Sequence, residues 1–209
     1  MNILVVAPHP DDLEFGCAGT ISKFKEQGAE VDVIITVRPC EEIHDNRSQL
    51  IVQQELRDSM DLLDLHYQLF HTPLSDNDRP LLSCTPDSIT QLESMIDKEY
   101  DLVITTDPGD FHQDHVTTFN MVNSICRKNV KELWTMEVSP YSNRNLTFIP
   151  NVFVDISNQF PLKLEAISCY NSYIDNSHMT GIIGLNSHRA TQIKGASQVE
   201  AFNQIFRNI

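Results

Sequence analysis

Short apolar runs alternate along this chain with segments in which apolar residues recur at helical spacing. The run Ile3–Ala7 is continuous and rich in β-branched residues, which is typical of a strand covered on both faces of a sheet. A helical pattern over Cys17–Gln27 is closed by Gly28 and leads to a second apolar run, Val31–Val37. This order of strand, loop, helix and strand predicts the opening of a doubly wound α/β sheet.

The same alternation continues along the rest of the chain. Helical spacing predicts further helices at Gln49–Leu65, Thr85–Glu99, His115–Lys128, Phe160–Tyr173 and Gln198–Phe206. Apolar runs predict further strands at Tyr67–Phe70, Leu102–Thr106, Leu133–Met136 and Val152–Val154. Residues 38–48 and 71–86 are polar or proline-rich and are expected to form loops, whereas 174–197 shows no clear pattern. We therefore expect an α/β fold in one domain, 1–209, with a Rossmann-like, open, mostly parallel sheet and helices on both faces.

Two short clusters of His and Asp follow two of the predicted strands. The first is Pro8-His9-Pro10-Asp11-Asp12, directly after Ile3–Ala7, and the second is His112-Gln113-Asp114-His115, shortly after Leu102–Thr106. Ligands of open α/β sheets bind outside the carboxyl ends of the strands, so both clusters lie at the expected edge. Either cluster alone is compatible with a turn or a helix start. Together their carboxylates would be costly to bury without a cation, which favours a shared divalent metal.

The residue types narrow the metal further. Two imidazoles and one carboxylate, with a position left open for water, are typical of catalytic zinc rather than of structural zinc, which more often uses several cysteines. Fe²⁺ and Mn²⁺ accept the same ligands, so the residues favour one zinc ion per chain without excluding these metals. The spacing does not decide whether Asp11 or Asp12 binds the metal.

Composition excludes several other classes of protein. The 209 residues carry a formal net charge of −14, with 15 basic against 29 acidic side chains, which argues against nucleic-acid binding and against docking on anionic membranes. No apolar run approaches the roughly 20 residues that span a bilayer. The five cysteines are scattered without a CxxC pair, and Met1-Asn2 leads straight into a strand, so we expect a cytoplasmic protein with reduced thiols. The sequence is compatible with either a monomer or a homo-oligomer.

The clusters also carry a resemblance to the family of zinc-dependent N-acetylglucosaminyl deacetylases related to PIG-L and LmbE. The family signature is Ala-His-Pro-Asp-Asp after the first strand and His-x-Asp-His later; here Pro8 is inserted between Ala7 and His9. The stretch from Lys163 to Ser172 resembles another shared segment, and Val199-Glu200-Ala201-Phe202 resembles the family's C-terminal helix. The resemblance therefore extends over nearly the whole chain.

The resemblance implies a role for each member of the two clusters. The implied metal ligands are His9, Asp12 and His115. Asp11 would be the general base that activates water, and a protonated His112 would stabilise the developing oxyanion. Asp114 would orient an imidazole and hold its pKa up.

The expected reaction is removal of an acetyl group from an N-acetylated amino sugar or sugar conjugate, a small-molecule partner. The alternative is another N-acyl compound, such as a glycosylated thiol conjugate or a natural-product intermediate. A phosphoester hydrolase is disfavoured because such sites usually hold two metals, and a dehydrogenase is disfavoured because no GxGxxG follows the first strand. The candidate substrate contacts are Arg47, Asp76 and His178.

Overall fold

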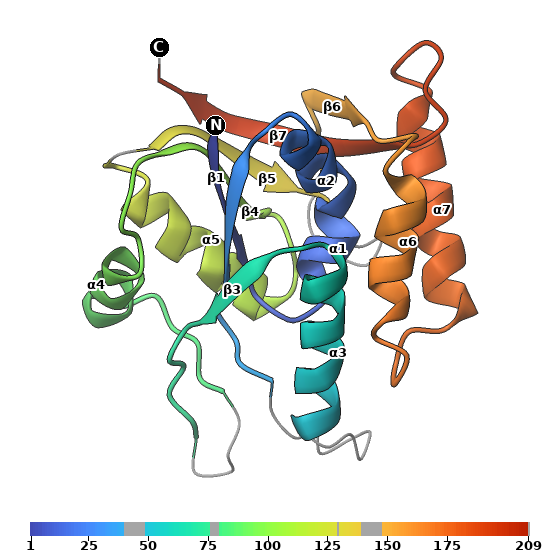
Figure 1. Ribbon diagram of the computed structural model, residues 1–209. Helices are drawn as coiled ribbons and strands as arrows, with labels where there is room; N and C mark the ends of the chain where they lie inside the picture. The colour runs from blue at the N-terminus through green and yellow to red at the C-terminus, as the bar shows by residue number, and fades with distance from the viewer. Residues whose placement is uncertain (40–48, 76–79, 129, 139–147, 209) are drawn as a thin grey trace.

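Seven strands form one open sheet in the computed structural model, in the order β3-β2-β1-β4-β5-β7-β6 (Figure 1). The structure describes residues 1–39, 49–75, 80–128, 130–138 and 148–208. The strands are β1 (Asn2–Ala7), β2 (Glu30–Ile35), β3 (His66–Leu69), β4 (Tyr100–Thr106), β5 (Val130–Met136), β6 (Val152–Asp155) and β7 (Val199–Arg207). β7 is antiparallel to both of its neighbours and every other pairing is parallel, which confirms the mostly parallel sheet expected from the sequence.

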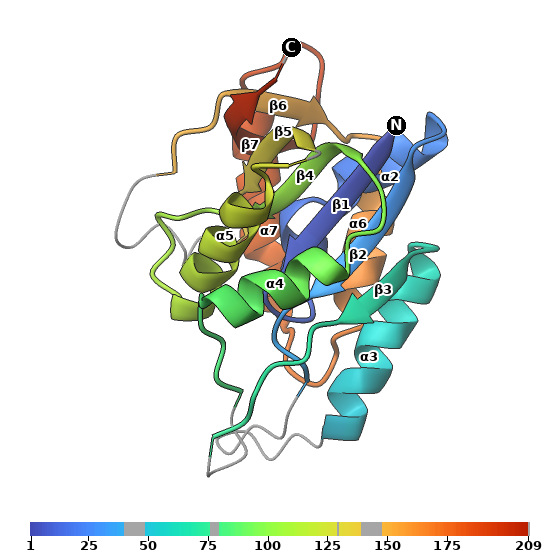
Figure 2. The same cartoon turned by 90° about the vertical axis from the view of Figure 1, so that its left-hand side faces the viewer.

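Helices cover both faces of this sheet, as predicted. They are α1 (Asp12–Gly16), α2 (Ala18–Glu26), α3 (Gln49–Leu62), α4 (Pro86–Ser94), α5 (Gln113–Ile125), α6 (Phe160–Ser168) and α7 (Asn176–Ala190). In Figure 2, α4 and α5 stand in front of the sheet, with α2 and α6 behind it. No helix in the described part of the chain is long and apolar enough to cross a membrane.

Strand β1 lies at the centre of the core. Ile3 and Val5 belong to the apolar cluster that packs against α1, α2, α3 and α6, and Leu4 and Val6 belong to the cluster on the side of α4 and α5. All four side chains are essentially inaccessible to solvent. A strand enclosed on both faces in this way needs the continuous apolar run that the sequence shows.

The pairing of β1 with β4 decides where the two His/Asp clusters meet. These strands are parallel neighbours, with Ile3 opposite Leu102 and Val6 opposite Thr105. Their carboxyl ends therefore reach the same edge of the sheet, and the loops that follow lead into α1 and α5. Segments about a hundred residues apart in the sequence are thus brought side by side.

The C-terminal segment corrects one prediction. The expected helix Gln198–Phe206 is wrong, because Val199–Arg207 is the strand β7, inserted between β5 and β6. Its first four residues are all buried, including Glu200. The helix was expected from helical spacing and from the family resemblance, but the apolar residues of so short a segment do not separate helix from strand. The expected helix over Phe160–Tyr173 is also shorter, because α6 ends at Ser168.

Glu200 is buried for a structural reason. Its carboxylate accepts hydrogen bonds from the backbone N–H groups of Gly19 and Thr20, at 3.0 and 2.6 Å, and so caps the first turn of α2. It also forms a 2.7 Å ion pair with the buried Lys163 of α6, whose Nζ donates to the carbonyl oxygen of Phe15. These contacts join α1, α2, α6 and β7.

We predict that Lys163→Met strongly destabilises the fold. It leaves the Glu200 carboxylate buried without its charged partner, which typically costs about 3–5 kcal/mol. The free energy of unfolding in urea measures this loss. Lys131→Met is the matched control, because the Lys131–Asp101 pair lies at the surface and is screened by water. Equal losses in the two variants would contradict the structural role assigned to Lys163.

Candidate functional site

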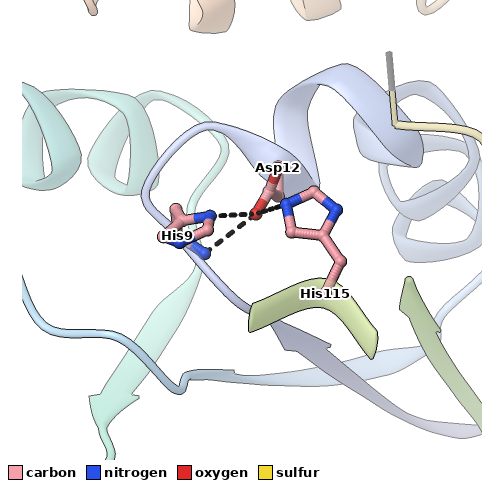
Figure 3. Close-up of side chains that lie close together, drawn as sticks. All are labelled: His9, Asp12 and His115. Carbon is pink, nitrogen blue, oxygen red and sulfur yellow. Dashed lines mark hydrogen bonds and ion pairs between the residues drawn. The ribbon is translucent and has the colours of Figure 1, made fainter. Parts of the chain in front are cut away.

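Three side chains of the predicted metal site converge at the carboxyl edge of the sheet (Figure 3). His9 lies in the loop after β1, Asp12 is the first residue of α1, and His115 lies in the first turn of α5. The Asp12 carboxylate stands between the two imidazole rings. The backbone also fixes this carboxylate, because Asp12 Oδ2 accepts a 2.9 Å hydrogen bond from the N–H of His9.

The two separations between the Asp12 oxygen and the imidazole nitrogens fit ligands of a tetrahedral metal ion. Asp12 Oδ2 lies 3.2 Å from His9 Nδ1 and 3.4 Å from His115 Nε2. Ligand atoms bonded to zinc at about 2.0–2.1 Å would lie roughly 3.3 Å from one another. The donor set of two imidazoles and a carboxylate also matches catalytic zinc, so these residues fit the metal that the sequence suggests.

The electrostatics of the three residues favour a cation. Burial acts to raise the pKa of Asp12, but the charge of His115 and hydrogen bonds from both imidazoles outweigh it and lower the pKa well below its usual range. Burial acts to lower the pKa of His9 and His115, yet their carboxylate partners raise these pKa values to about 9 and about 10. A metal ion would therefore take the place of protons, and its binding is coupled to proton release.

A further carboxylate orients each imidazole. His115 Nδ1 lies 2.6 Å from Asp110 Oδ2, and His9 Nε2 lies 3.1 Å from Asp114 Oδ2. Such partners fix the tautomer and the orientation of a ligating imidazole. His9 thus faces a carboxylate with each of its nitrogens, Asp12 with Nδ1 and Asp114 with Nε2. His9, His112 and Asp114 also offer donor atoms within 4.8 Å of one another.

Asp11, the expected general base, has a strained backbone and a buried carboxyl group. Its φ of 94° lies in the left-handed region, which residues other than glycine seldom adopt outside sites where the surroundings enforce it. Its Oδ2 accepts a 2.8 Å hydrogen bond from the hydroxyl of Tyr173. Burial, followed by the charge of Asp12, raises the pKa of Asp11 well above its usual range, and the Tyr173 hydrogen bond partly opposes this.

His112 has its ring proton fixed by the start of α5. It is the N-cap residue, and its Nδ1 accepts a hydrogen bond from the backbone N–H of Asp114 at 3.2 Å. Burial, followed by the charges of His9 and His115, lowers the pKa of His112. This direction, together with the hydrogen bond at Nδ1, favours a neutral ring in which Nε2 carries the proton and remains a donor. The protonated ring implied by the resemblance stays a prediction.

Two cavities meet at this centre, and both are lined by Asp11, Asp12, His112 and Tyr173. The first, of about 320 Å³, is also lined by Val37, Arg38, Pro39 and Val52. The second, of about 360 Å³, is also lined by Phe15, Phe111, Val138, Ile174 and His178. The candidate catalytic groups thus lie where the two cavities join.

The predicted substrate contacts have different outcomes. His178 lines the second cavity, where its Nδ1 lies 2.7 Å from Asp175. Arg47 and Asp76 lie outside the described residues. Arg38, Asp110 and Tyr173 were not predicted. Asp110 had a detectable signal in its position in the loop after β4, whereas Tyr173 meets Asp11 from 162 positions away and had none.

The sequence from residue 4 to residue 126 matches the family described as "PIG-L: GlcNAc-PI de-N-acetylase". The chain belongs to the PIG-L family of deacetylases. Among its relatives is the "Uncharacterized deacetylase YaiS" of Escherichia coli, which is 27% identical over 179 residues, covering 82% of this chain and 91% of that protein. The family resemblance drawn from the two clusters is thereby confirmed.

Solved structures confirm the fold of this PIG-L member over its whole length. The N,N'-diacetylchitobiose deacetylase of Pyrococcus horikoshii aligns with a TM-score of 0.74 and 22% identity, covering 98% of this chain and 83% of that one. GalB, a 4-carboxy-2-hydroxymuconate hydratase of Pseudomonas putida, aligns with a TM-score of 0.78 and 15% identity, covering 100% and 97%. The fold thus serves more than one reaction, and the reaction must be argued from the site.

We predict that Asp110→Asn weakens zinc binding by about 10–100-fold, because His115 loses the carboxylate that orients its ring. Competition with a chromophoric chelator measures the affinity. Asp107→Asn is the matched control, since Asp107 belongs to the same loop but bonds the backbone of Gly109 and the hydroxyl of Thr135. Equal weakening in both variants would contradict the role of Asp110.

Proposed function

We propose that this chain is a zinc-dependent N-deacetylase that hydrolyses the acetamide of an N-acetylated amino sugar or sugar conjugate. The proposed zinc ligands are His9, Asp12 and His115. One observation carries the proposal: their donor atoms converge beside Asp11 and His112, where two cavities meet. Metal binding alone needs neither Asp11 nor His112, whereas amide hydrolysis needs a base and an oxyanion donor.

Asp11 supplies the general base. A bound zinc ion would contribute a Lewis acid and lower the pKa of water to roughly 7. The Asp11 carboxylate then accepts the proton of the attacking water. Tyr173 holds Oδ2 by its 2.8 Å hydrogen bond, so we assign Oδ1 as the oxygen that takes the proton.

His112 supplies the oxyanion donor. Because Nδ1 accepts a backbone hydrogen bond, the ring proton lies on Nε2 and can be donated to the amide oxygen as negative charge develops there. A preformed donor of this kind needs no rearrangement during the reaction. Asp114 would keep the His9 ring in place through its contact with Nε2.

The leaving amine needs a proton, and Asp11 is the group best suited to return it. A neutral imidazole whose single proton lies on Nε2 would have to become an anion to act as the acid. Asp11 carries the proton that it took from water, and its carboxyl group lies next to the same reacting atoms. One residue thus acts first as base and then as acid.

The two cavities would hold the two sides of the amide. Arg38 offers a guanidinium group to hydroxyl and phosphate oxygens in the first cavity, and His178 offers an imidazole in the second. Arg47 and Asp76 stay predictions from the sequence. The apolar side chains that line the second cavity are compatible with the alternative substrate, another N-acyl compound such as a natural-product intermediate.

Release of amine from a panel of N-acetylated sugars, nucleotide sugars and glycosylated thiols tests the proposal. We expect zinc-loaded protein to release acetate and a free amine from at least one N-acetylglucosamine derivative, with about one zinc per chain by elemental analysis. Removal of the metal by a chelator should abolish the release, and added zinc should restore it. Metal-loaded protein that is silent across the whole panel would contradict the sugar substrate.

We predict that Asp11→Asn keeps its zinc but lowers kcat by about 10²–10⁴-fold, because the amide cannot accept a proton. Asn tolerates left-handed backbone, so the fold should persist. Asp64→Asn is the matched control: Asp64 also has positive φ, at 51°, but lies at an exposed position away from the centre. Full activity in Asp11→Asn would refute the base assignment.

A further inference from the structure

The two cavities divide any bound amide into two parts. They share Asp11, Asp12, His112 and Tyr173, so a substrate whose carbonyl lies at this junction sends its acyl group into one cavity and its amine into the other. Which part enters which cavity depends on the chemistry of the remaining walls. This question goes beyond the proposed reaction, although the answer rests on it.

The two linings differ in polarity. The first cavity adds the guanidinium of Arg38 to the shared carboxylates and imidazole, beside the smaller apolar side chains of Val37, Pro39 and Val52. The guanidinium suits a hydroxylated amine such as an amino sugar. Among the described residues, the second cavity adds four apolar side chains, those of Phe15, Phe111, Val138 and Ile174. It also adds His178, and Asp110 and His115 at the metal centre. Away from the metal centre, His178 is the polar side chain that the described part of this wall offers to sugar hydroxyls, whose burial without hydrogen bonds would be costly. The acyl group is therefore the better occupant of the second cavity.

The second cavity is also large for an acetyl group. Its volume is about 360 Å³, which includes the space beside the shared residues Asp11, Asp12, His112 and Tyr173. The methyl of an acetyl group fills only about 30 Å³, close to the volume of one water molecule. A cavity with apolar walls and this much space can take several more methylene groups, each of which gains from leaving water.

We propose that the second cavity is an acyl-binding subsite and that this protein hydrolyses amides of medium-length straight acyl chains, butanoyl to hexanoyl, better than acetamides. Water adds to the acyl carbon and the C–N bond breaks. The products are the fatty carboxylate and the free amine. Phe111 is 47% exposed and belongs to the wall of this cavity, which gives the chain an apolar surface to pass on entry.

A series of N-acyl glucosamines from acetyl to octanoyl tests the proposal with zinc-loaded protein. We expect kcat/KM to rise by about fourfold for each methylene that is buried, up to hexanoyl. Turnover of the acetyl compound with none of the longer ones would overturn the acyl subsite and leave the deacetylase proposal standing. Silence towards all of them would instead count against the deacetylase proposal.

A binding measurement keeps the subsite testable even without turnover. Acetate, butanoate and hexanoate are the matching products, and calorimetry on zinc-loaded protein measures their affinity. We expect the affinity to tighten by about fourfold per methylene. An affinity that does not depend on chain length would overturn the proposal.

A matched pair of variants separates the two cavities. Val138→Phe fills the second cavity and should abolish the gain with chain length, whereas Val52→Phe adds the same volume to the first cavity and should leave that gain unchanged. Because added bulk can destabilise a packed wall, Ile174→Ala provides a third variant. It should move the optimum to longer chains. An identical chain-length profile in all three variants would refute the assignment of the acyl group to this cavity.

Discussion

The parallel pairing of β1 with β4 is the constraint on which the site depends. Both strands are buried on both faces, so neither can slip by a residue without moving its apolar side chains out of the core. Their register places Val6 opposite Thr105, and the polar loops that follow must then emerge at one edge. The core therefore fixes the distance between His9 and His115 before either residue meets a metal. Stability and geometry of the site have a common origin.

Burial of charge is the second constraint, and it explains why the two clusters belong together. Asp12 and Asp110 lie almost out of contact with solvent, and each faces an imidazole. Negative charge in such a place needs a proton or a cation on the neighbouring nitrogens. The raised pKa values of His9 and His115 show that, without a metal, protons on these rings balance the carboxylate charges. A divalent metal ion would supply the same positive charge at a single position, so these residues are suited to bind one.

The parts of the fold that the sequence predicted are those specified by local pattern. The run Ile3–Ala7 has few alternatives to a buried strand, and both His/Asp clusters lie at strand ends, so the edge of the sheet where they meet was predictable. The choice of Asp12 over Asp11 as a ligand came from the family resemblance. β7 was not predictable in this way, because Glu200 interrupts its apolar residues. The burial of the Glu200 charge is explained by its contacts with Lys163 and with the first turn of α2, which the sequence does not reveal.

Contacts between distant segments account for the rest of what the sequence left out. Tyr173 reaches Asp11 from the segment between α6 and α7, and no spacing in the sequence relates the two. The pKa of His112 depends on distant segments in a similar way, because burial and the charges of His9 and His115 lower it. Family resemblance transfers the identity of such residues, but their protonation follows from the surroundings that the whole fold provides.

Local folding and chemistry share the same hydrogen bonds at this edge of the sheet. The bond from the backbone N–H of Asp114 to His112 Nδ1 satisfies one of the free donors at the start of α5. The same bond fixes the ring proton on Nε2, the atom that an oxyanion would need. Asp11 follows the same logic, since its left-handed backbone begins α1 while its carboxyl group lies beside the centre. Because helix starts specify these states, a change in substrate preference can arise in the cavity walls without altering the catalytic groups.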